Sequence, residues 1–93
     1  MIKSFKDSET ENIFNGKKSR KFASIQKVAK RKLDMIHFAF SEKDLVVPPA
    51  NHFEHLKGSL SGFYSIRIND QYRIIFSFQN GCAYDVQIVD YHK

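Results

Sequence analysis

The sequence predicts an α+β domain in which two helices pack on one face of a single antiparallel sheet. The first observation is a helical spacing of apolar residues between Ile25 and Phe40. The second is a change to a period of two after Pro49, which is typical of strands. The third is Asn80-Gly81, since both residues tolerate the positive φ of a two-residue hairpin. We therefore expect a β-α-α order followed by an antiparallel β meander.

The first two elements are expected to be short. Residues Ile2 to Phe5 alternate between apolar and polar, which predicts a first strand. Ser8 and Glu11 have the spacing of a capping box, so a helix is expected from about Glu9 to Phe14. Asn15-Gly16 is a typical helix stop.

A longer helix follows the basic connector Lys17 to Phe22 and is expected over Ser24 to Phe40. Pro48-Pro49 breaks the chain after it, because proline cannot donate a backbone hydrogen bond. The inward face is predicted from the apolar spacing, and the outward face from the charges. The inward positions are Ile25, Val28, Ala29, Leu33, Ile36 and Phe40, and the outward ones are Lys27, Lys30 and Arg31.

Three alternating runs, at residues 64–69, 72–79 and 84–89, predict the strands of the meander, with a turn at Asn69-Asp70-Gln71 between the first two. One side of these runs is apolar and is expected to lie under the helices. That row consists of Tyr64, Ile66, Ile68, Tyr72, Ile74, Phe76 and Phe78.

The other face of the sheet is expected to carry the function. It holds Arg67, Arg73, Ser77, Gln79 and Gln87, and an antiparallel sheet can leave such a face in water. On this interpretation Arg67 and Arg73 are surface groups of a shallow basic concavity.

Composition limits the class of protein. Hydrophobic residues make up 42% of the 93 residues, which is enough for one core and therefore one domain over residues 1–93. The single Cys82 excludes an internal disulfide, and no apolar run could span a bilayer. Since Met1 to Phe5 is short and followed by charges, we expect no signal peptide and a cytoplasmic location.

Positive charge is concentrated in one segment. Eight of the 15 Lys and Arg residues lie between Lys17 and Lys32, where no acidic residue occurs. This distribution favours a polyanionic partner or an acidic protein surface over a merely solvated helix face.

The end of the chain collects three proton-handling groups, Asp90, Tyr91 and His92. Strand ends in small domains usually fray, so packing alone does not explain this triplet. We expect it to meet Lys57 and Arg73 at the rim of the sheet and to cleave a phosphodiester there.

Roles within this expected site follow from the side chains. An imidazole with its ordinary pKa of about 6.5 carries protons in either direction, which suits His92. Asp90 could orient that ring, help accept a proton or form a surface ion pair, and Tyr91 could stack on a base or pack in the core. Arg73 and Lys57 suit phosphate binding, and Arg67 suits the substrate backbone.

A metal site is not expected. His52 and His55 stand three residues apart, but no second histidine pair or cysteine completes a ligand set. No cofactor motif occurs either.

Four segments in order resemble the HigB toxins, also called plasmid maintenance killer proteins, of the RelE-like toxin superfamily. The similarity covers nearly the whole chain and extends to Ile2-Lys3-Ser4-Phe5. The segments are Pro48-Pro49-Ala50-Asn51, Leu56-Lys57-Gly58, Tyr64 to Ile74 and Asp90-Tyr91-His92.

The resemblance implies a RelE-like fold and a metal-independent endoribonuclease that cuts mRNA on the ribosome. It also implies a HigA-like helix-turn-helix antitoxin as the protein partner. The toxin would contact operator DNA only indirectly, through this antitoxin, and no membrane partner is implied. Active-site positions carry over to Lys57, Arg73, Asp90, Tyr91 and His92. Relatives have a histidine three residues before the lysine, so either Glu54, which holds that position, or His55 is expected to face the substrate.

Two other functions are compatible with such a sequence. RelE-like folds also carry non-enzymatic toxins that bind a protein such as gyrase, and these do not need the terminal triplet. A plain nucleic-acid-binding module would use Lys27, Lys30 and Arg31 alone. In the favoured hypothesis these three cations contact ribosomal RNA or an acidic face of the antitoxin.

Overall fold

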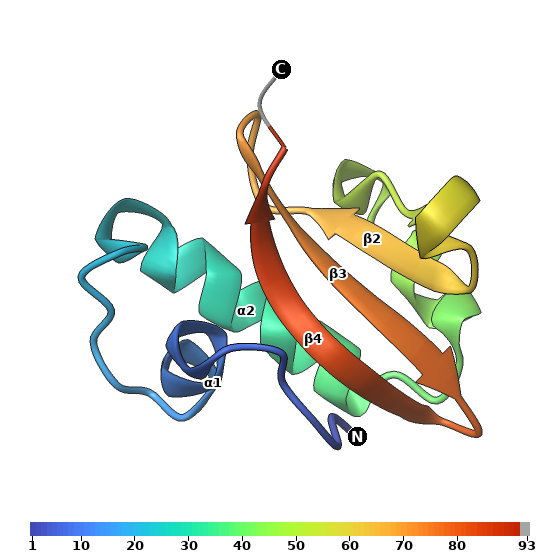
Figure 1. Ribbon diagram of the computed structural model, residues 1–93, viewed down its shortest axis with the longest axis horizontal. Helices are drawn as coiled ribbons and strands as arrows, with labels where there is room; N and C mark the ends of the chain where they lie inside the picture. Colours follow the sequence, from blue (N-terminus) through green and yellow to red (C-terminus); the bar gives the residue numbers. More distant parts are fainter. Residues whose placement is uncertain (92–93) are drawn as a thin grey trace.

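The fold is built on a sheet of four antiparallel strands in the order β1-β2-β3-β4. The computed structural model describes residues 1–91, and it places α2 behind the sheet and α1 beside β4 (Figure 1). This arrangement confirms the predicted α+β class, with both helices on one side. The strands are β1 (Glu54–His55), β2 (Phe63–Arg67), β3 (Tyr72–Gln79) and β4 (Cys82–Asp90).

Both predicted turns of the meander are confirmed. Asn80 and Gly81 have φ values of 52° and 79° and join β3 directly to β4. In the other turn, Asn69 Oδ1 accepts hydrogen bonds from the backbone N–H groups of Gln71 and Tyr72, each at 2.8 Å. These side-chain bonds replace the backbone bonds that the reversal leaves unmade.

The predicted first strand is reduced to two isolated bridges. Ile2 and Phe5 bridge Ala83 and Val86 in parallel along the outer edge of β4. Between the bridges, β4 contains Asp85 at φ 54°, and the β3–β4 register shifts nearby. This irregularity interrupts the edge, so a continuous ladder cannot form.

Helix α1 (Ser8–Phe14) begins one residue earlier than predicted, because Asp7 and not Ser8 is its cap. Asp7 is extended, and its carboxylate accepts from the Thr10 N–H at 3.0 Å and from the Thr10 hydroxyl at 2.7 Å. The Thr10 hydroxyl in turn accepts from the Ile88 N–H at 3.1 Å, which ties the helix start to β4.

The second helix is shorter than the predicted Ser24 to Phe40. A 3₁₀ turn, η1 (Ala23–Ile25), precedes α2 (Gln26–Phe38), and Ala39 is already extended at φ −70° and ψ 137°. Ala29, Leu33 and Ile36 face inward as predicted, and Lys32 is buried with them.

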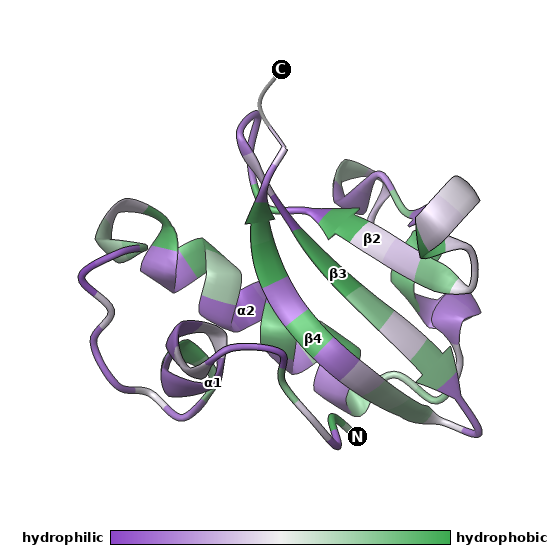
Figure 2. Ribbon diagram, viewed as in Figure 1, coloured by the Kyte–Doolittle hydropathy of each residue, from purple (hydrophilic) through white to green (hydrophobic). Residues whose placement is uncertain are grey.

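The core lies between the helices and the apolar side of the sheet. Figure 2 shows apolar and polar residues alternating along β4, and the apolar residues Ala83, Val86 and Ile88 of this strand are buried. Five residues of the predicted strand row are buried, namely Ile66, Ile68, Ile74, Phe76 and Phe78, and the other two, Tyr64 and Tyr72, are partly buried against the core. Ile13, Leu33, Ile36, Leu45 and Val86 are fully buried with them.

The connection from α2 to β2 contains three more 3₁₀ turns and the short strand β1, none of which periodicity predicted. They are η2 (Glu42–Val46), η3 (Pro49–Asn51) and η4 (Gly58–Leu60). After η3, His52 adopts the left-handed conformation at φ 44° and ψ 54°. No helix among residues 1–91 is long and apolar enough to cross a membrane.

Candidate active site around Arg73

Strand register brings four polar side chains to the sheet face opposite the helices. Glu54 pairs with Ser65, and Arg67 pairs with Arg73 on the next strand. Directly paired residues project to the same side of a sheet. This side is therefore the one that carries the candidate site.

Arg73 is the centre of this face, and it is buried, with 8% of its surface exposed. Its Nε donates to Ser65 Oγ at 2.9 Å, and one terminal nitrogen donates to the His52 carbonyl. The Glu54 carboxylate lies 3.5 Å from the same terminal nitrogen. The ring of Tyr91 lies over the guanidinium, at 5.4 Å from its carbon to the ring centroid. We call Glu54, Ser65, Arg73 and Tyr91, with the His52 carbonyl, the Arg73 cluster.

The expectation that Arg73 is a surface group was wrong. Alternation fixes the face on which a side chain lies, but the η3–β1 segment and Tyr91 cover that face at Arg73. A buried guanidinium is tolerable because acceptors surround it. Arg67 fits the expectation better, since one third of its side chain is exposed and it forms an ion pair with exposed Asp70.

Glu54 and His55 alternate along β1 and therefore point to opposite sides of the strand. Glu54 lies on the side of Arg73, with half of its side chain exposed. The His55 ring instead contacts Phe53 and Tyr64, at centroid distances of 5.5 Å and 4.9 Å. Glu54 is thus the one that the fold brings to the cluster.

The chain end is tied to the turn between β2 and β3. Asp90 pairs with Tyr72 and accepts from the Gln71 side chain at 3.2 Å, while the Tyr91 N–H donates to the Gln71 carbonyl. These bonds direct Tyr91 over Arg73 as predicted. His92 lies outside the described residues.

The remaining predicted site residues lie on the surface. Lys57 is exposed and caps η4, two residues after β1. Lys27 and Arg31 are exposed on α2. Lys30 is also partly exposed, but it pairs with Asp34 at 2.7 Å, and its ammonium lies 5.0 Å from the Phe14 ring centroid.

Two residues close to the cluster were missed in the sequence, Lys32 and Asn51. Lys32 is 7% exposed and Asn51 is fully buried, and they are joined by a hydrogen bond of 2.6 Å. Lys32 occupies the inward face of α2 three residues after Ala29, so its helical position was the available signal. Burial, followed by the neighbouring charges of Arg31 and Arg67, lowers the pKa of Lys32 from 10.5.

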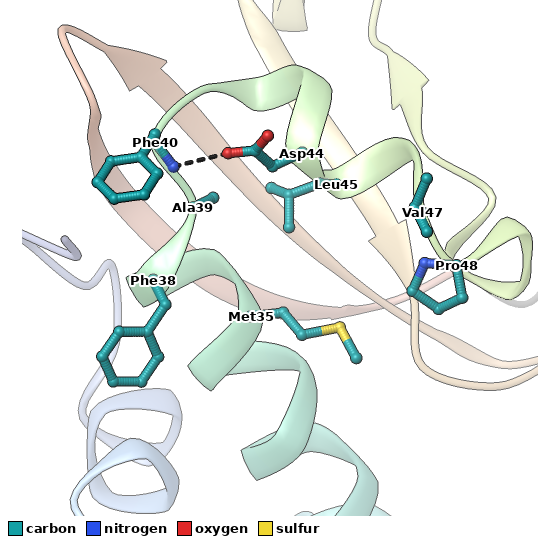
Figure 3. A pocket seen from close by; sticks show the side chains of 8 residues that line it. All are labelled: Met35, Phe38, Ala39, Phe40, Asp44, Leu45, Val47 and Pro48. Carbon is teal, nitrogen blue, oxygen red and sulfur yellow. Dashed lines mark hydrogen bonds between the residues drawn. The ribbon is translucent and has the colours of Figure 1, made fainter.

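An apolar groove lies on the helical side, where α2 ends (Figure 3). It is a hollow of about 480 Å³, and Phe38 and Phe40 at its rim are 74% and 89% exposed. The groove is lined by Met35, Phe38, Ala39, Phe40, Asp44, Leu45, Val47 and Pro48.

The Arg73 cluster holds a fixed guanidinium that can stabilise negative charge. The exposed ammonium of Lys57 belongs to the loop that follows β1 in the chain. Among the described residues, no group of three or more His, Cys, Asp or Glu side chains could hold a metal ion.

Comparison with known proteins identifies the family. Residues 3–92 match the family model described as RelE-like toxin of type II toxin-antitoxin system HigB. The chain belongs to this family. Toxin HigB-1 of Vibrio cholerae serotype O1 is 41% identical over 95 residues, which cover 100% of this chain and 99% of the relative.

Two solved structures share the fold of this HigB-like chain. YafQ from E. coli has a TM-score of 0.64 at 11% identity, covering 98% of this chain and 92% of YafQ. A toxin–antitoxin complex of YoeB and YefM from Staphylococcus aureus contains a chain with a TM-score of 0.63 at 20% identity. That match covers 100% of this chain and 97% of the other. The chain is therefore a RelE-like toxin of a type II toxin–antitoxin system.

Proposed function

We propose that this toxin is a metal-independent endoribonuclease that cleaves mRNA bound to the ribosome and thereby inhibits translation. The observation that carries the proposal is the Arg73 cluster, in which a guanidinium is fixed beneath Tyr91 and beside a carboxylate. Exposed Lys57 lies three residues beyond Glu54, Asp90 is the last residue of β4, and Tyr91 and His92 follow it in the sequence.

The reaction that suits these groups is an internal transfer within RNA. The 2′-hydroxyl attacks the adjacent phosphorus, its proton passes to a base, and the bond to the 5′-oxygen breaks while an acid protonates that oxygen. The products are a 2′,3′-cyclic phosphate and a 5′-hydroxyl end. His92, Asp90 and Glu54 are the proton carriers that we assign, without distinguishing the acid from the base.

Positive charge on the pentacoordinate phosphate comes from two cations with different access. Only 10% of the Arg73 side chain is exposed, so this residue acts mainly through its fixed charge. Lys57 is exposed, so its flexible side chain can stay in contact with the phosphate as the reaction proceeds. Tyr91 is 41% exposed and offers a ring on which a base could stack.

The ribosome is assigned the role of positioning the message, because orientation alone can supply much of a rate enhancement. Activity on free RNA is therefore expected to be weak. The protein partner under this proposal is a HigA-like helix-turn-helix antitoxin, which restrains the toxin.

The proposal is tested by measuring cleavage of ribosome-bound message with the purified toxin and mapping the 5′ ends. We expect Lys57→Ala to lower the single-turnover rate about 100-fold, because a charge that meets the transition state is lost. His92→Gln is expected to reduce the rate as well. Thermal unfolding should be unchanged in the Lys57 variant, since that side chain is exposed.

Lys43→Ala is the matched control, since Lys43 is an exposed lysine on η2, outside the site. Full cleavage by folded Lys57→Ala and His92→Gln variants would refute the proposed site. Intact messages together with DNA breaks after induction would instead indicate a toxin that acts on gyrase.

A further inference from the structure

We infer that Lys32 and Asn51 are positioning residues for Arg73, acting through the His52 carbonyl. Their catalytic consequence depends on the proposed nuclease function, but the structural link does not. Each step from α2 to the guanidinium is a hydrogen bond or a single peptide unit.

The first step is a buried ammonium on the core-facing side of α2. Lys32 lies among Ala29, Leu33 and Ile36, where an apolar side chain would be the ordinary choice. Its Nζ donates to Asn51 Oδ1 at 2.6 Å. Because a buried charge costs free energy, a lysine here indicates that its donor is required.

The second step is the fully buried side chain of Asn51, whose two polar atoms bond to two different elements. Oδ1 accepts from Lys32 on α2, and Nδ2 donates to the Leu45 carbonyl of η2 at 3.1 Å. Nδ2 also lies 3.9 Å from the sulfur of Met35. Figure 3 shows both Met35 of α2 and Leu45 of η2 lining the groove, and the bonds of Asn51 to these two residues hold it where α2 and η2 meet.

The third step is the turn that follows Asn51. The Asn51 N–H donates to the Pro48 carbonyl at 2.9 Å, and the His52 N–H donates to the Pro49 carbonyl at 3.0 Å. His52 is left-handed, a conformation that is rare for a residue with a Cβ and needs support from its surroundings. This turn aims the His52 carbonyl at the Arg73 guanidinium.

The result is a connection between the helical layer and the opposite face of the sheet. Fixing Asn51 fixes the His52 carbonyl, and that carbonyl and Ser65 Oγ together set the plane of the guanidinium. Holding the Arg73 guanidinium in place before the transition state forms makes its charge more effective in stabilising that state. Lys32 itself contacts neither the guanidinium nor the exposed surface of the site.

The test compares Lys32→Met, which keeps the apolar stem but removes the donor, with Lys32→Arg, which keeps a cationic donor. The first measurement is hydrogen exchange of the Arg73 Nε–H by NMR, which needs no activity. The second is single-turnover cleavage of ribosome-bound message, with the affinity for the ribosome measured separately. Lys43→Met controls for the loss of one positive charge.

We expect Lys32→Met to accelerate the exchange of the Arg73 Nε–H and to lower the cleavage rate about tenfold, with affinity changed less than about twofold. Lys32→Arg should restore both quantities, and Lys43→Met should change neither. If Lys32→Met does not fold, Lys32→Leu is measured in its place, because its side chain also lacks a donor and suits a buried helix position.

Wild-type exchange of the Arg73 Nε–H in a folded Lys32→Met variant would overturn the inference. Equal impairment in Lys32→Met and Lys32→Arg would overturn it too, since packing and not the donor would then matter. A wild-type toxin that cleaves no ribosome-bound message would refute the proposed function, while the exchange measurement would still decide the inference.

Discussion

The two paired arginines of β2 and β3, Arg67 and Arg73, occupy opposite environments on the same sheet face. Arg73 is buried, and three acceptors and an aromatic ring surround it. Arg67 keeps one third of its side chain exposed and pairs with an exposed carboxylate. Strand pairing alone would make them equivalent. The difference arises because the segment η3–β1 covers Arg73 and leaves Arg67 partly exposed. The guanidinium of Arg73 is therefore fixed in position, whereas that of Arg67 can move.

The largest expected effect is the loss of stability in Arg73→Ala. This change leaves Ser65 Oγ and the His52 carbonyl without their donor, and Glu54 without its ion pair. Glu54 is half exposed and stays solvated, so the loss comes mainly from the buried hydrogen-bond acceptors, each of which costs about 1 to 3 kcal/mol when it lacks a donor. Urea unfolding should therefore show a large drop in the free energy of unfolding.

Arg67→Ala is the matched control for this comparison, because the two residues are register partners. An exposed ion pair contributes about 1 kcal/mol or less, so its variant should remain close to wild type. Similar losses from both changes would mean that the burial of Arg73 has no energetic consequence. Because Arg73→Ala is expected to destabilise the protein, a loss of cleavage in this variant would not by itself show a catalytic role.

The sequence could predict those parts of the fold in which the spacing of apolar residues along the chain matches the side that is buried. β3 was predicted with its bounds, and the inward stripe of α2 followed from Ala29, Leu33 and Ile36. The Asn80-Gly81 hairpin followed from local turn chemistry. In each case the information lies within a few neighbouring residues.

The site was predictable only in its residue types. That Arg73 and Tyr91 come together followed from placing both at one sheet rim, but the burial of Arg73 depends on a non-periodic segment with a left-handed His52. Lys32 was interpreted as surface charge because of its residue type, although its helical position pointed inward. Tertiary contacts across 19 residues, between Lys32 and Asn51, leave no local pattern.

A second expected effect concerns the pH dependence that buried Lys32 adds to stability. Its pKa is lowered in the folded state from 10.5, chiefly by burial and then by Arg31 and Arg67. Between the folded pKa and 10.5, the unfolded chain binds more protons than the folded one, so this residue adds stability as the pH rises. Below the folded pKa both states are protonated, and the contribution is constant.

The measurement is the difference in unfolding free energy between wild type and Lys32→Met across this window. Other groups titrate in both proteins, so the difference isolates Lys32. We expect wild type to gain relative to the variant as the pH approaches 10.5. A difference that is flat, or that falls with pH, would show that the folded state does not favour the neutral amine.

The smallest effect on stability is expected at the exposed cations of α2, because their side chains are in solvent and are not part of the core. Replacing Lys27 and Arg31 by Gln should change the unfolding free energy by less than about 0.5 kcal/mol. If these residues contact ribosomal RNA, the slope of log affinity against log salt should fall by about one to two, since each phosphate contact releases about one counterion.

The control for this prediction is the pair Lys3→Gln and Lys6→Gln, which removes the same charge from exposed residues near the amino terminus. An equal change of slope in both double variants would assign the salt dependence to net charge. A change confined to Lys27 and Arg31 would assign it to α2. The cleavage rate of bound message should stay the same in either pair, because neither lies in the Arg73 cluster, and a reduced rate would place α2 in the chemistry itself.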